Sequence, residues 1–235
     1  YIGNGPYKMT EWSHNAYISM EKNENYYDYD NLGPDTIKFT LLDDNNAMLK
    51  GYNNGELDFI ENLPVDEIPT YLASGELEIG DYLGTYYVCF NTEDEVFSDP
   101  NIRKAFSLVI DRNYIVENVS QAGEVPADGY VPNGVNDAAG PGSDDFRTVG
   151  GSYYSISEED YEKNCEEARQ LLADAGYPNG EGFPTVEYLY NTADNHKKIG
   201  EALQNMWQTE LGVTVNLNNQ DWNVFLQNRK DGNFQ

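Results

Sequence analysis

Residues 83–92 have the sequence Leu-Gly-Thr-Tyr-Tyr-Val-Cys-Phe-Asn-Thr, and the organisation of the chain changes at this stretch. Aromatic and β-branched residues favour strands, and their nearly continuous run predicts a strand buried on both faces or passing between two lobes. Asn91 and Thr92 supply the turn chemistry that ends it. Short strand-like runs and turns precede this segment, whereas long amphipathic helices and a strand–helix–strand unit follow it.

The composition indicates an acidic, aromatic-rich globular chain. Its 235 residues include 41 Asp and Glu against 14 Lys and Arg, which gives a formal net charge of −27. A field of this sign repels phosphate backbones and anionic lipid, so we expect no nucleic acid partner and no basic membrane-binding face. Because 39% of the residues are hydrophobic and 19 are Tyr, the chain can form a sizeable core and is no disordered acidic tail. No run approaches the roughly 20 apolar residues of a membrane span.

The N-terminal part is predicted to alternate strands with short helices. Alternation of apolar and polar residues marks the strands, and residues 43–46 supply N-cap candidates for a helix. The acidic, aromatic stretch 21–31 lacks the spacing of a calcium loop, so we interpret it as a solvated loop. The predicted strands are residues 7–12, 17–20, 36–42 and one starting at 57–60, and the predicted helices are one that ends at Asn53 and one at residues 64–74.

Helices dominate after the central segment. Asp99 can cap a helix that starts at Pro100, and Asp111 can cap the next one. The predicted elements are helices from 100 and at 113–119, an irregular excursion at 123–154, a helix at 157–175, and a strand–helix–strand unit at 185–191, 195–211 and 213–217. Such a unit implies a parallel strand pair with a right-handed crossover. Its ligand-facing edge is expected at the carboxyl end of the first strand, near residues 191–196.

Few residues suit catalysis or metal binding. Cys89 and Cys165 lie far apart on apolar segments, so we expect two buried free thiols, and their spacing does not support the alternative of a disulfide. His14 and His196 are the two histidines, and no nucleophile elbow, zinc-binding helix motif or Cys-x-x-Cys pair is present. We therefore expect no enzyme activity, no metal and no cofactor.

Motifs spread along the chain form one pattern: the central Leu-Gly-Thr-Tyr-Tyr with Phe-Asn-Thr, Gly3-Asn4-Gly5-Pro6-Tyr7-Lys8, Gly55-Glu56-Leu57-Asp58, Arg103-Lys104-Ala105, Ile110-Asp111-Arg112, Tyr190-Asn191-Thr192 with Asn195-His196, Met206-Trp207, Leu211-Gly212-Val213, and Asp221-Trp222 with Arg229. This pattern resembles the oligopeptide-binding proteins that serve ABC importers, extracellular solute-binding protein family 5. The likeness runs in register from Gly3 to Gln235 and is weakest after Gly123. In that family the central strand leaves one lobe, passes the ligand cleft and enters the next.

The resemblance implies a mixed α/β fold of the type II periplasmic-binding-protein kind, with parts of two lobes joined by a crossover strand. Residues 1–85 would form a portion of the first lobe, and residues 86–235 a portion of the peptide-binding lobe, truncated at the C-terminus. It also implies an extracytoplasmic receptor, either periplasmic or a cell-surface lipoprotein of a Gram-positive bacterium. Such a receptor binds an oligopeptide and delivers it to an ABC permease in the membrane.

Four residues are predicted to bind ligand. The resemblance places His196 and Arg229 at positions that help hold the carboxylate end of a peptide. A guanidinium suits that role because it binds a carboxylate through two parallel hydrogen bonds, although His196 could also be an exposed or capping residue. Tyr86 and Tyr87 should point to opposite faces of their strand, so at least one of them is expected to face the cleft.

Other interpretations remain open at this level. A member of the same family could bind another solute, such as nickel or an oligosaccharide, and the Tyr and Trp content also fits a carbohydrate-active enzyme or adhesion module. The chain opens at Tyr1 and ends in what resembles the start of a strand, so we expect it to be a piece of something longer. The family's ammonium-binding Asp would lie beyond Gln235, and we expect the isolated chain to fold but to bind peptide weakly or not at all.

Overall fold

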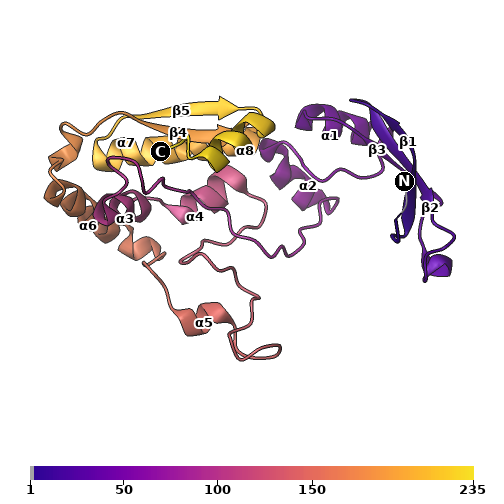
Figure 1. Cartoon of the computed structure of the whole chain (residues 1–235), viewed down its shortest axis with the longest axis horizontal. Helices are drawn as coiled ribbons and strands as arrows, with labels where there is room; N and C mark the ends of the chain where they lie inside the picture. The colour runs from indigo at the N-terminus through magenta and orange to yellow at the C-terminus, as the bar shows by residue number, and fades with distance from the viewer. Residues whose placement is uncertain (1–2) are drawn as a thin grey trace. The chain divides into compact units, whose positions relative to one another are not determined.

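The computed structural model describes residues 3–235, which form two compact units that divide between Pro64 and Val65 (Figure 1). The first unit contains a three-stranded antiparallel sheet in the order β1-β2-β3. Its elements are β1 (Tyr7–Ser13), β2 (Tyr17–Lys22), the short 3-10 helix η1 (Tyr29–Asn31), β3 (Thr36–Thr40) and α1 (Asn45–Asn53). The three predicted strands before residue 42 and the helix ending at Asn53 are confirmed.

The first unit confirms one predicted cap and corrects one predicted strand. Asp44 caps α1, and its Oδ1 atom accepts a hydrogen bond of 2.7 Å from the Ala47 N–H. Residues 57–60 form no strand, because the chain folds back on the end of α1 instead. The N–H groups of Glu56 and Leu57 both donate to the Gly51 carbonyl, a helix-terminal arrangement that leaves no extended run for a ladder.

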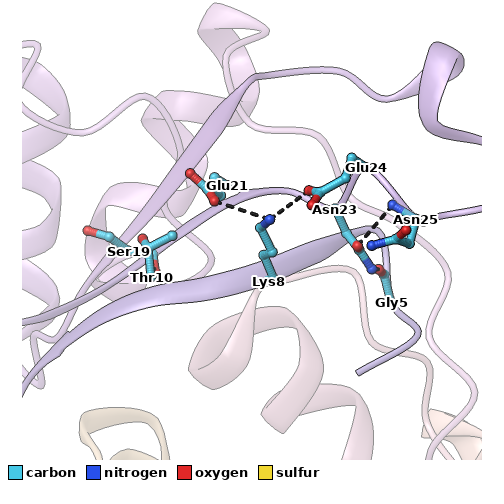
Figure 2. Close-up of polar contacts among 8 residues, drawn as sticks. All are labelled: Gly5, Lys8, Thr10, Ser19, Glu21, Asn23, Glu24 and Asn25. Atoms are coloured by element: carbon cyan, nitrogen blue, oxygen red, sulfur yellow. Dashed lines mark hydrogen bonds and ion pairs between the residues drawn. The ribbon is translucent and has the colours of Figure 1, made fainter. Parts of the chain in front are cut away.

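A polar cluster fixes the start of this sheet (Figure 2). Lys8 pairs with Glu24 at 2.6 Å and with Glu21 at 3.4 Å. Asn23 is buried, and its Nδ2 atom donates to the Gly5 carbonyl at 2.9 Å while its Oδ1 atom accepts from the Asn25 N–H at 3.1 Å. Since a buried amide without partners is costly, these bonds hold the turn after β2 against the strand that begins the sheet.

The second unit contains most of the helices and one parallel strand pair. Its helices are η2 (Val65–Glu67), α2 (Ile68–Ser74), α3 (Pro100–Leu108), α4 (Arg112–Tyr114), the π-helix η3 (Ile115–Ser120), α5 (Phe146–Gly150), η4 (Glu158–Asp160), α6 (Tyr161–Asp174), η5 (Pro178–Gly180), α7 (Asp194–Leu211) and α8 (Trp222–Asp231). The strands β4 (Val186–Asn191) and β5 (Val215–Gln220) pair in parallel. The predicted strand–helix–strand unit is therefore confirmed, and so are the caps of Asp99 and Asp111.

An aromatic cluster forms the centre of the second unit's core. Phe106 on α3 is 1% exposed and its ring lies within 5.1–6.2 Å of the rings of Phe90, Phe97, Phe183 and Trp207. The Trp207 Nε1–H donates a buried hydrogen bond of 2.9 Å to the Phe106 carbonyl. This bond gives the buried indole N–H an acceptor, and it links α7 to α3.

Helix α7 packs along the strand pair (Figure 1). At Gly200 a Cβ atom would lie only 3.2 Å from the Tyr188 ring, so the absence of a side chain lets helix and sheet approach closely. Helix α6 completes this layer, with Cys165, Ala168 and Leu172 buried on the face that the sequence predicted.

The central segment differs from its prediction. Residues 83–92 pair with no other strand among the residues that the structure describes, and Tyr86 and Tyr87 are 54% and 47% exposed. Only Val88 and Phe90 pack against the core. The prediction of a strand buried on both faces was wrong for this chain, because strand propensity describes the residues alone while a ladder needs partner strands on either side.

One cysteine was also misplaced. Cys165 is fully buried, as predicted, whereas Cys89 is exposed and lines a cavity. Both thiols are free. The prediction placed Cys89 in a buried strand. Its side chain is exposed because no strand pairs with residues 83–92 among the residues that the structure describes.

The two thiols should therefore react at very different rates. Burial raises the pKa of Cys165 to about 11, so its thiol is both hidden and protonated at pH 8. We expect a thiol reagent to label one group quickly in the native chain and the second only on unfolding. Cys89→Ser should abolish the fast phase, and Cys165→Ser should leave it intact. Equal rates for the two thiols in mass spectrometry would contradict the burial of Cys165.

Candidate functional site

The candidate site is a cavity of about 500 Å³ in the second unit. One wall is the extended segment at residues 85–90 and the other is the whole length of β4. Helix α8 contributes Trp222, Phe225 and Arg229 to its lining. All four residues predicted to bind ligand lie on this cavity, namely Tyr86, Tyr87, His196 and Arg229.

Tyr86 and His196 are in direct contact. Strand β4 ends at Asn191 and α7 begins at Asp194, so His196 lies in the first turn of α7, close to the carboxyl end of the strand. The Tyr86 hydroxyl is 2.9 Å from His196 Nδ1, and the two ring centroids are 5.5 Å apart. His196 is half-buried, so the alternative of a freely exposed histidine does not hold.

Burial keeps this end of the cavity uncharged at neutral pH. Desolvation lowers the pKa of His196 below its ordinary value of 6.5. Desolvation also raises the pKa of Tyr86, against a smaller opposing effect of its hydrogen bond with Tyr188. The pKa of Tyr188 is raised strongly by burial. The three side chains therefore offer ring surface and neutral hydrogen-bonding groups, which suit a polar but uncharged backbone.

Tyr87 and Arg229 form a second group around Tyr130. The rings of Tyr87 and Tyr130 meet edge to face with centroids 5.1 Å apart. The pKa of Tyr130 is raised chiefly by its hydrogen bond with Tyr87, and the positive charge of Arg229 acts in the opposite direction. Arg229 is exposed, and no carboxylate among residues 3–235 lies within ion-pair distance of it. Its guanidinium is therefore available to an anionic group.

Sequence reasoning missed helix α8, the lining residue Phe225, and Tyr130, which contacts the lining residue Tyr87. Helix α8 was not predicted, although Trp222, Phe225 and Arg229 recur at steps of three and four, which is a helical signal. Tyr130 lies in the predicted irregular excursion, where no periodicity could identify it.

Residues 3–235 contain no group of three or more His, Cys, Asp and Glu side chains that could hold a metal ion. No helix within that range is both long and apolar enough to cross a membrane.

The chain resembles known proteins over its whole length. The family described as "Bacterial extracellular solute-binding proteins, family 5 Middle" matches residues 1–235. Among curated proteins, the chain is 34% identical to the oligopeptide-binding protein OppA of Bacillus subtilis (strain 168), over 100% of this chain and 42% of OppA. It is 36% identical to the dipeptide-binding protein DppE of the same strain, over 100% of this chain and 41% of DppE.

A solved structure agrees with this likeness. Haemophilus influenzae OppA in complex with the peptide RPPGFSPFR superimposes with a TM-score of 0.82 and 28% identity, over 100% of this chain and 45% of that one. The predicted mixed α/β fold of the periplasmic-binding-protein kind is thereby confirmed. The chain spans about two fifths of the length of the curated relatives it matches.

The protonation of His196 provides a test of the cavity's geometry. Because the folded state favours the neutral ring, we expect His196 to titrate below pH 6.5 and the chain to lose stability as pH falls through that value. NMR titration of the ring C–H signals, assigned with His196→Gln, measures the pKa. Tyr86→Ala should remove the covering ring and move the pKa upward, whereas Tyr86→Phe keeps that ring and should move it less. A native pKa at or above 6.5 would contradict the burial of the ring.

Proposed function

The chain belongs to the bacterial extracellular solute-binding proteins of family 5, and we propose that its parent protein is a receptor that binds oligopeptides outside the cytoplasm and delivers them to an ABC permease. The observation that carries the proposal is the cavity between residues 85–90 and β4, on which the four predicted ligand-binding residues meet. Relatives named for oligopeptide and dipeptide binding support the same ligand class.

The chemistry of the cavity suits a peptide. Tyr86, Tyr188 and His196 offer neutral hydrogen-bonding groups and aromatic surface at the carboxyl end of β4, where open α/β sheets gather ligand groups. Arg229 adds a cation without a carboxylate partner among residues 3–235, and in a chain of net charge −27 it is a local attraction for an anion. We therefore assign Tyr86 and Tyr87 to the peptide backbone or side chains, and His196 and Arg229 to its carboxylate end.

The proposal extends to organisation and location. We assign residues 1–85 to the first lobe and residues 86–235 to the peptide-binding lobe, with closure of the lobes around the ligand in the whole protein. The two compact units divide earlier, between Pro64 and Val65. Relatives named as periplasmic support an extracytoplasmic receptor, either periplasmic or a cell-surface lipoprotein. Membership of a family of solute-binding proteins favours this function over a carbohydrate-active enzyme or adhesion module.

The ligand class can be identified directly. The whole protein should be purified from its native source and analysed by mass spectrometry under native conditions, and then again after denaturation. We expect peptides of a few residues to co-purify and to be released on denaturation. Release of an oligosaccharide, a metal ion or another solute in place of peptides would overturn the proposed ligand class.

The role of Arg229 gives a specific prediction. In the whole protein, Arg229→Ala should weaken binding of a peptide with a free carboxylate by about 1.5–3 kcal/mol, the range for a charge-assisted hydrogen bond. The same peptide with an amidated carboxyl end should lose much less. Lys230→Ala is the matched control, because it removes a neighbouring positive charge that does not line the cavity. Equal losses for the free and amidated peptides in calorimetry would rule out the carboxylate role.

A further inference from the structure

The irregular excursion at residues 123–154 places an exposed tyrosine beside the candidate site. Tyr130 is 63% exposed and is not among the side chains that pack into the core. Its ring meets the ring of Tyr87 edge to face, with centroids 5.1 Å apart. The hydrogen bond with Tyr87 is the main cause of the raised pKa of Tyr130, and the charge of Arg229 opposes it. Tyr130 therefore lies next to two residues that line the cavity.

A nearly buried ion pair fixes the backbone directly before Tyr130. Arg147 Nη2 lies 2.8 Å from Asp128 Oδ1, and the side chain of Arg147 is only 10% exposed. The other carboxylate oxygen of Asp128 accepts a hydrogen bond from the Ser152 hydroxyl. Arg147 Nη2 also donates to the Gly151 carbonyl at 2.6 Å. Separating this pair would leave a charge in poor contact with water, so the two parts of the excursion are held together.

Further contacts join the same segment to the core. A Cβ atom at Gly129 would overlap the Arg147 guanidinium, so the absence of a side chain lets that group lie on the backbone. The Tyr154 hydroxyl donates to the Ala127 carbonyl at 3.1 Å, and the Tyr154 ring lies 4.1 Å from the Arg112 guanidinium. Arg112 in turn donates to two backbone carbonyls at and just after the end of α3. Residues 127–129 are thus fixed although they belong to no helix or strand.

The stability of the fold does not account for a ring held in this way. Aromatic side chains stabilise a protein mainly when they are buried, whereas Tyr130 leaves more than half of its surface in water. Its neighbour Arg229 has no carboxylate within ion-pair distance among residues 3–235. A fixed, exposed ring beside an available cation suits a ligand that carries an anionic group and an apolar side chain on the same residue.

We propose that Tyr130 is a specificity-determining residue of the peptide site, which contacts the side chain of the residue whose carboxylate Arg229 binds, and that the ion pair before it positions its ring. This inference rests on the proposed function, because it takes a peptide as the ligand and Arg229 as its carboxylate partner. An exposed ring favours other aromatic rings through edge-to-face or offset-stacked contacts. The preferred ligands are therefore peptides with an aromatic carboxyl-terminal residue.

Peptides that differ only in their last residue test the role of Tyr130. Calorimetry on the whole protein should compare Ala-Ala-Phe with Ala-Ala-Ala, and the pentapeptide Ala-Ala-Ala-Ala-Phe with its all-alanine counterpart. We expect the peptides ending in Phe to bind more tightly, and Tyr130→Ala to reduce the ratio of the two affinities by roughly three- to tenfold. Tyr130→Phe keeps the ring and should keep the ratio. Tyr153→Ala is the matched control, because it removes a ring of the same excursion that is 78% exposed and does not line the cavity.

Two results would overturn the specificity role. One is a wild-type protein that binds the peptides ending in Phe and in Ala equally well. The other is a ratio that Tyr130→Ala leaves unchanged, whether or not it weakens both peptides alike. Because Tyr130 is exposed, its variants should fold, and they test the proposal independently of any change to the ion pair.

Asp128→Asn tests the positioning role, since it removes the negative charge that pairs with Arg147 and leaves the Tyr130 ring in the chain. We expect it to reduce the same ratio. Combined with Tyr130→Ala it should reduce the ratio no further than Tyr130→Ala alone, because a positioning residue acts through the ring. Additive reductions in the double variant, or equal weakening of all four peptides by Asp128→Asn, would show that the ion pair does not act through Tyr130.

The same measurements distinguish this inference from the proposed function. If the wild-type protein binds none of the four peptides, the proposed ligand class is wrong and the role of Tyr130 falls with it. If it binds them and the ratio is insensitive to Tyr130→Ala, the ligand class stands and Tyr130 does not determine specificity.

Discussion

The buried hydrogen bond from the Trp207 indole to the Phe106 carbonyl joins the parts on which the site depends. It links α7, which carries His196, to α3, whose Phe106 ring touches Phe90 at the end of the central segment. An indole N–H buried without a partner would cost free energy, so the two helices are held in the one arrangement that satisfies it. Phe106 and Trp207 both line the cavity, so this packing forms part of its wall.

Charge is distributed unevenly between surface and cavity. The chain carries a net charge of −27, yet the groups at the carboxyl end of β4 favour their neutral forms, and burial strengthens this preference by lowering the pKa of His196 and raising those of Tyr86 and Tyr188. Acidic residues remain in water, where their charge costs little, and aromatic hydroxyls occupy the half-buried site. Neutral aromatic side chains and the Arg229 guanidinium therefore line much of the cavity of an otherwise acidic chain.

Several features were determined by the sequence alone, because they depend on residues within a few positions of one another. Asp44, Asp99 and Asp111 accept hydrogen bonds from backbone N–H groups two or three residues ahead, as their positions before apolar stripes predicted. The spacing of apolar residues predicted helices α6 and α7. The length of the strand–helix–strand unit predicted that β4 and β5 pair in parallel. The family motifs also brought Tyr86, Tyr87, His196 and Arg229 to one cavity, although their ligand roles remain predictions.

Other features were decided by tertiary structure, because they depend on partners far away in the chain. The composition of residues 83–92 favours a strand, but a strand exists only where another backbone lies alongside it, and no ladder forms here among residues 3–235. Cys89 is exposed for the same reason, while Cys165 is buried because it lies with Ala168 and Leu172 on the face of α6 that packs into the core. The contact between Tyr86 and His196 spans 110 positions of sequence. Local propensity determines which residues suit a strand or a helix. Only the packed chain determines which strand edges are paired and which side chains are buried.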